Sequence, residues 1–128
     1  MAVMPKETIA ATIEEDGLDM AHAIVDLAED KKASDITLMD LRASTTLTDY
    51  FVIVTGASSR QIGSISSAIL EGMTNRNTRP VANEGRPDDG WMILDFGQVI
   101  VHIFAPAERA YYDLERRWQE AATLLKIQ

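Results

Sequence analysis

The chain has 128 residues, of which 46% are hydrophobic and 25% are charged, and it contains no cysteine. This composition predicts a single soluble domain and excludes disulfides, thiol nucleophiles and thiolate metal sites. The formal net charge of −8 argues against broad contact with nucleic-acid phosphates and against sequence-specific nucleic-acid binding. The sequence has neither an apolar run of membrane-spanning length nor a secretion signal, so we expect a cytoplasmic protein without membrane contact.

The first half of the chain predicts a leader, a helix and two strands. Residues 1–16 contain few large apolar groups and are expected to be a flexible leader, so that residues 17–128 form a single domain. Residues 18–33 carry apolar side chains at three- and four-residue spacing, which predicts an amphipathic helix. Residues 35–41 are a predicted strand, and residues 50–55, all aromatic or β-branched, are a predicted strand buried on both faces.

A glycine turn and a second helix follow the buried strand. Gly56 supplies the turn, and Ser58 or Ser59 can cap a helix that extends to about Asn75. The free amides of the first helical turn are able to bind a phosphate or carboxylate. No lysine follows the glycine and no further glycine completes a phosphate-binding pattern, so a helix capped by serine is the preferred interpretation.

The second half of the chain predicts three strands and a last helix. Residues 80–83 begin with proline, which is typical of an edge strand. A polar loop then leads to an antiparallel hairpin of residues 91–95 and 98–104, with Phe96 and Gly97 at the turn. Residues 106–125 are predicted to form one helix that buries Tyr111, Leu114 and Trp118.

The order of these elements defines the expected fold class. A helix, two strands, a helix, three strands and a helix predict an α/β fold with a mixed sheet of about five strands. The closing hairpin must be antiparallel, whereas the earlier crossover helix favours parallel pairing. The flanking helices make two or three layers with this sheet.

Candidate catalytic and metal-ligating residues are few. Residues 56–59 are similar to the turn of nucleotidyltransferases, in which the next strand offers paired carboxylates to two magnesium ions. Here that strand supplies only Glu84, and Asp88 with Asp89 lies beyond it in a loop. His102 alternates with apolar neighbours along a strand and is expected to be a structural histidine. We therefore expect no cofactor and no metal, with a nucleotide-binding enzyme as the alternative.

Aromatic and arginine residues indicate a binding surface instead. The strand that begins at Trp91 and the helix that carries Tyr112 contain the residue types enriched in the energetic centres of protein interfaces. Asp95 is expected to cap the hairpin turn by accepting backbone N–H bonds, or alternatively to meet a basic partner. Core packing is the other interpretation of Tyr111 and Trp118.

Six sequence blocks resemble the ribosomal silencing factor family, RsfS, also called Iojap. They keep the family's order and cover most of residues 18–118. The blocks are DL (40–41), TDYFVI (48–53), TGASSRQI (55–62), EG (84–85), WMILDFGQVIVH (91–102) and RAYYDLERRW (109–118). Gln98 departs from the pattern, because many relatives carry an acidic residue there.

This resemblance implies a nucleotidyltransferase-like fold without known transferase activity. Members bind the fourteenth protein of the large ribosomal subunit, block joining of the small subunit and so lower translation when nutrients are scarce. It also implies a homodimer in the free state. An assembly factor for the large subunit remains an alternative. The residues expected to contact the partner are Trp91, Leu94, Asp95, Phe96, Gly97, Tyr112, Glu115 and Arg116.

Overall fold

The structure is a computed structural model that describes residues 16–128, so the predicted leader lies outside it except for Asp16. Its helices are α2 (Gly17–Asp30), α3 (Ser59–Asn75), the 3₁₀ helix η1 (Pro87–Asp89), α4 (Pro106–Tyr112) and α5 (Leu114–Arg117). Its strands are β1 (Ser34–Asp40), β2 (Tyr50–Thr55), β3 (Ala82–Glu84), β4 (Trp91–Asp95), β5 (Val99–Phe104) and β6 (Ala122–Ile127). No helix in this part of the chain is long and apolar enough to cross a membrane.

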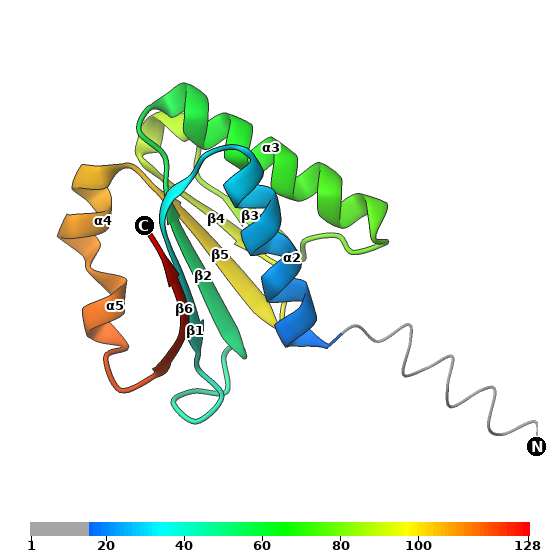
Figure 1. The fold of residues 1–128 in the computed structure, drawn as a ribbon, viewed down its shortest axis with the longest axis vertical. Helices are drawn as coiled ribbons and strands as arrows, with labels where there is room; N and C mark the ends of the chain where they lie inside the picture. Colours follow the sequence, from blue (N-terminus) through cyan, green and yellow to red (C-terminus); the bar gives the residue numbers. More distant parts are fainter. Residues whose placement is uncertain (1–15) are drawn as a thin grey trace, which may run out of the picture.

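One mixed sheet joins all the strands, in the order β3-β4-β5-β2-β1-β6 (Figure 1). The central strands β2 and β5 are parallel, with Tyr50 opposite Val99 and Thr55 opposite Phe104. All other neighbours are antiparallel. The predicted α/β class, the mixed sheet, the hairpin of β4 and β5 and the edge position of β3 are therefore confirmed.

Helices cover both faces of the sheet, which gives three layers (Figure 1). Successive side chains of a strand point to opposite faces, and the buried strand β2 shows the result. Val52 and Val54 belong to the larger apolar cluster, which lies under α2 and α3, whereas Phe51 and Ile53 belong to the smaller cluster on the other face. The smaller cluster is completed by Leu114 and Trp118 from the α4–α5 side.

Short-range contacts fix α2 and α3 on the face of the sheet that they cover. The Asp16 carboxylate accepts a hydrogen bond from the Leu18 N–H at 3.2 Å and caps α2. The two helices approach closely where Gly72 of α3 meets Leu27 of α2, since a Cβ atom at Gly72 would lie 2.5 Å from Leu27 Cδ2. The packing of α3 on α2 thus depends on the missing side chain.

The prediction of a single helix over residues 106–125 is wrong. Asp113 interrupts it with left-handed backbone angles, φ 47° and ψ 55°, which aspartate tolerates better than most residues. After the single turn of α5 the chain forms β6, which pairs with β1 and places Leu125 opposite Leu38. This pairing covers an edge that β1 would otherwise expose, and it makes the sheet six strands wide instead of about five. Tyr111, predicted to be buried, is 80% exposed.

Candidate functional site

The glycine turn after β2 is closed by contacts within the chain. Ser58 is the N-cap of α3, and its hydroxyl accepts a hydrogen bond from the Gln61 N–H at 3.1 Å. The Gln61 side chain accepts from the Ala57 N–H at 2.6 Å and donates to the carbonyl of Lys32 at 2.9 Å. The N–H groups of Ala57 and Gln61, which an anion at this turn would need, are therefore already hydrogen-bonded to side chains. The predicted serine cap is confirmed.

Gly56 has a packing role at this turn. A Cβ atom there would lie 2.8 Å from Ile62 Cγ1, so the glycine lets the first turn of α3 approach the end of β2. Acidic residues do not converge on the turn. Within residues 16–128, no three side chains of histidine, aspartate or glutamate are grouped as metal ligands. Asp89 instead accepts a hydrogen bond from the Arg86 N–H at 2.9 Å within η1.

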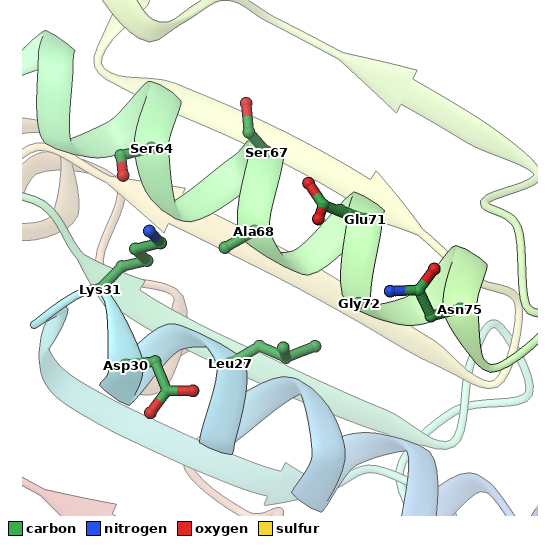
Figure 2. A pocket seen from close by; sticks show the side chains of 9 residues that line it. All are labelled: Leu27, Asp30, Lys31, Ser64, Ser67, Ala68, Glu71, Gly72 and Asn75. Atoms are coloured by element: carbon green, nitrogen blue, oxygen red, sulfur yellow. The ribbon is translucent and has the colours of Figure 1, made fainter.

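A shallow hollow lies between α2 and α3 (Figure 2). Its floor is made by Leu27, Ala68 and Gly72, and the helices approach closely at Leu27 and Gly72. Its margins combine Lys31 with carboxylates and with small polar side chains of α3. Charges of both signs and an open shape do not define a ligand, and we assign the hollow to helix packing.

The opposite face of the sheet offers a better candidate at its margin. Helices α4 and α5 leave the outer side of β4 partly uncovered, and Trp91, Ile93 and Asp95 lie there as half-buried residues. Tyr112 joins them from α4, with its ring centroid 4.4 Å from that of Trp91. We call these four residues the β4–α4 surface. A surface that carries large rings with polar tips and, at the other end of the strand, a carboxylate is suited to binding a protein partner.

Trp91 is held in place on this surface by contacts on several sides. Its indole stacks on Phe104 at a centroid distance of 4.9 Å. Its Nε1–H donates a hydrogen bond to His102 Nδ1 at 3.1 Å. His102 comes from the neighbouring strand β5 and is only 5% exposed. Burial lowers the pKa of His102 to about 4, so its ring is neutral at physiological pH.

The structure places the predicted partner-binding residues in different environments. Leu94 is 0% exposed and Phe96 is 6% exposed, and both belong to the larger cluster on the opposite face, which corrects the expectation that they offer surface to a partner. The alternation of a strand explains the error, because Leu94 is three positions from Trp91 and so points the other way. Trp91 and Tyr112 remain accessible.

Asp95 and Gly97 form the tip of the hairpin. The Asp95 carboxylate accepts a hydrogen bond from the Gly97 N–H at 2.8 Å, which confirms the predicted cap. Gly97 is exposed and adopts φ 85°, a left-handed conformation that glycine reaches without strain. Its carbonyl accepts a hydrogen bond from the buried Thr48 hydroxyl at 2.9 Å, so the tip has a fixed position.

Glu115 has a partner inside the molecule. Its carboxylate accepts a hydrogen bond from Arg109 Nη2 at 2.5 Å, and the same guanidinium donates to the hydroxyls of Thr55 at 2.9 Å and Thr37 at 3.1 Å. It also donates to the carbonyl of Asp35. Arg109 thereby ties α4 and α5 to β1 and β2. Arg116, by contrast, is exposed.

The Arg109 network was not among the expectations from the sequence. Its signal in the sequence is the pair of threonines Thr37 and Thr55, which are buried in β1 and β2 and face the same side of the sheet as Ile53. Buried hydroxyls need hydrogen-bond partners, and a guanidinium with five donors satisfies several at once. Placing Arg109 beside them requires the position of α4, which the sequence alone does not give.

The fold and this surface define a three-layer α/β domain with an aromatic margin. Residues 14–128 match the family model described as "Ribosomal silencing factor during starvation". The chain therefore belongs to the ribosomal silencing factor family. The family is named for a regulatory role, not for a catalytic one.

Individual relatives agree with this assignment. The chain is 34% identical over 93 residues to ribosomal silencing factor RsfS of Bacillus subtilis, an alignment that covers 73% of this chain and 79% of that protein. It is 31% identical over 98 residues to the mouse protein named mitochondrial assembly of ribosomal large subunit protein 1, covering 74% of this chain and 43% of the mouse protein. A crystal structure from Chromobacterium violaceum superposes with a TM-score of 0.79 at 28% identity, over 82% of this chain and 88% of that one.

Proposed function

We propose that this protein binds the large ribosomal subunit and prevents it from joining the small subunit. The observation that carries the proposal is the family match over residues 14–128. The proposed partner is the fourteenth protein of the large subunit, and the proposed mechanism is steric exclusion. Because the proposed target is a free large ribosomal subunit, we propose a cytoplasmic location.

Charge complementarity supports a basic partner. The chain has a formal net charge of −8, and complementary charge speeds the encounter of two proteins and selects among partners. On the β4–α4 surface, Asp95 would meet lysine or arginine, although its Oδ1 already caps the turn. We propose that Trp91 and Tyr112 supply the central contact and that Gly97 and Arg116 lie at its rim. Glu115 is proposed to act indirectly, through its hydrogen bond with Arg109.

A sedimentation experiment tests the proposed surface. Trp91→Ala should weaken binding to purified large subunits by about 30-fold or more, the loss typical of an aromatic residue at the centre of an interface. Leu124→Ala is the matched control: Leu124 is also a large apolar residue with exposed surface, but it lies on β6 at the opposite edge of the sheet. Equal binding of both variants, with both folded, would reject the β4–α4 surface.

The mouse relative favours a second candidate function. Its name refers to assembly of the ribosomal large subunit, so a role in assembly is the alternative to silencing. A light-scattering assay with mature subunits separates the two. A silencing factor inhibits joining of mature subunits, whereas a pure assembly factor leaves the joining rate unchanged.

We further propose that the free protein is a homodimer. The proposal rests on the family to which the chain belongs. Light scattering coupled to size-exclusion chromatography measures the mass directly, and a value equal to the 14.2 kDa of one chain across the micromolar range would reject the dimer.

A further inference from the structure

His102 is an unusual residue for its position. It lies in the middle of β5, a strand whose residues are all buried, and its strand neighbours on either side are Ile53 of β2 and Ile93 of β4. An apolar side chain would fill this place at lower cost, because burying a polar ring is unfavourable unless its nitrogens are hydrogen-bonded. The imidazole therefore needs an explanation.

Only one ring nitrogen of His102 is satisfied within the described part of the chain. An indole N–H is a donor and never an acceptor, so the bond from Trp91 requires an unprotonated Nδ1. The proton of the neutral ring must then reside on Nε2. That atom is buried and has no hydrogen-bond partner among residues 16–128. The molecule thus tolerates an unsatisfied N–H in order to present an acceptor to Trp91.

Other contacts of Trp91 do not fix its indole in the same way. Phe104 and Tyr112 offer ring faces, with interplanar angles to the indole of 27° and 42°. Stacked rings restrain the tilt of a neighbouring ring, but they allow it to slide or to rotate within its own plane. The hydrogen bond to His102 Nδ1 is directional and selects one orientation of the indole.

We infer that His102 is a positioning residue for binding: through its Nδ1 acceptor it holds Trp91 in the orientation that contacts the partner. The inference rests on the proposed function, because it requires Trp91 to be a contact residue. His102 itself does not contact the partner in this scheme, because its ring is enclosed by Phe51, Trp91 and Phe104. It acts on binding only through Trp91.

Two substitutions separate positioning from simple filling of space. His102→Asn places an amide oxygen near the position of Nδ1 and keeps an acceptor for the indole. His102→Leu fills the site with an apolar group and removes the acceptor. We expect the leucine variant to bind large subunits about fivefold more weakly, the effect of one neutral hydrogen bond. The asparagine variant should bind within about twofold of the natural protein, by the same reasoning.

A double-mutant cycle shows whether His102 acts through Trp91. In the background of Trp91→Ala, the change His102→Leu should have no further effect on binding, because the residue that it positions is gone. Additive losses would overturn the inference. Equal binding of the leucine variant and the natural protein, both folded, would also overturn it.

A spectroscopic signature keeps the inference testable even if the protein does not bind ribosomes. In NMR spectra of nitrogen-15 labelled protein, the Trp91 indole N–H should exchange slowly with solvent in the natural protein and in His102→Asn. In His102→Leu it should exchange much faster. Trp91→Phe assigns the signal, because Trp118 gives the other indole resonance. Failure of ribosome binding with this pattern intact rejects the proposed function, and with it the role in binding, but leaves the Trp91–His102 bond established. Slow exchange in the leucine variant rejects the bond itself.

Discussion

The buried imidazole of His102 makes the stability of the protein depend on pH in a calculable way. Burial lowers the pKa of this histidine from 6.5 to about 4. In the unfolded chain the ring binds a proton as the pH falls through 6.5, whereas in the folded protein it stays neutral until about 4. The unfolded state then holds more protons, so the free energy of unfolding falls as the solution is acidified.

The expected loss follows from the two pKa values. Each pH unit between them is equivalent to about 1.4 kcal/mol, so acidification from pH 7 to pH 5 should cost about 2 kcal/mol through His102 alone. His102→Asn removes the titrating ring and leaves an acceptor for Trp91. Urea unfolding of both proteins at pH 7, 6 and 5 isolates the contribution of this ring, because His22 and the carboxylates are common to both proteins.

The ring neighbours of His102 offer no compensating charge in this pH range. They are Phe51, Trp91 and Phe104, none of which titrates between pH 4 and 7. From pH 7 to pH 5, we expect the natural protein to lose about 2 kcal/mol of unfolding free energy relative to the His102→Asn variant. A difference that stays constant over this interval would refute the reasoning.

Three further substitutions test the packing by urea unfolding at pH 7. Arg109→Met leaves the buried hydroxyls and Glu115 without their donor and should destabilise the fold by about 2–4 kcal/mol, whereas the exposed neighbour Arg117→Met should change it by less than about 0.5 kcal/mol. Gly72→Ala should cost about 1–3 kcal/mol through the clash with Leu27, although alanine is the better helix former. Leu94→Ala should cost about 2–5 kcal/mol and leave ribosome binding by the folded fraction unchanged.

Each of these expectations has a clear contrary result. Equal stability of the Arg109 and Arg117 variants would mean that the guanidinium network contributes nothing. A stabilised Gly72→Ala protein would show that the helices can move apart. Weakened binding by folded Leu94→Ala protein would restore this residue to the contact surface.

The central fold was predictable from local patterns in the sequence. The run of β-branched and aromatic residues in β2, the serine cap of α3 and the glycine at the hairpin tip each depend on neighbours a few positions away. Their bounds agree with the structure to within a residue or two. The crossover helix predicted parallel pairing without saying which strands pair, and the structure shows it between β2 and β5.

The C-terminal segment could not be predicted in this way. Residues 106–125 carry a helical pattern, and the break depends on a left-handed Asp113 that the pattern does not require. What decides the outcome is the free edge of β1, which β6 covers across a long sequence separation. The sequence alone does not show that this edge of β1 lacks another strand to pair with.

The sequence indicates which residue types could form the candidate site but not how they are arranged. Trp91 and Tyr112 are residue types that favour interfaces, and the structure places their ring centroids 4.4 Å apart. Leu94 is large and apolar and so resembles a contact residue, but the alternation of side chains along a strand places it on the other face. The supporting residues His102 and Arg109 act through contacts from separate elements, which become visible only in three dimensions.

The central claim is that the protein keeps the large ribosomal subunit from joining the small one. The most direct measurement is the amplitude of light scattering when purified subunits are mixed after the large subunit has been incubated with this protein. The account predicts that the natural protein and Leu124→Ala reduce the amplitude in proportion to the protein added, up to one equivalent of bound protein, and that Trp91→Ala does so only at much higher concentration. Undiminished joining in the presence of saturating, folded natural protein would contradict it.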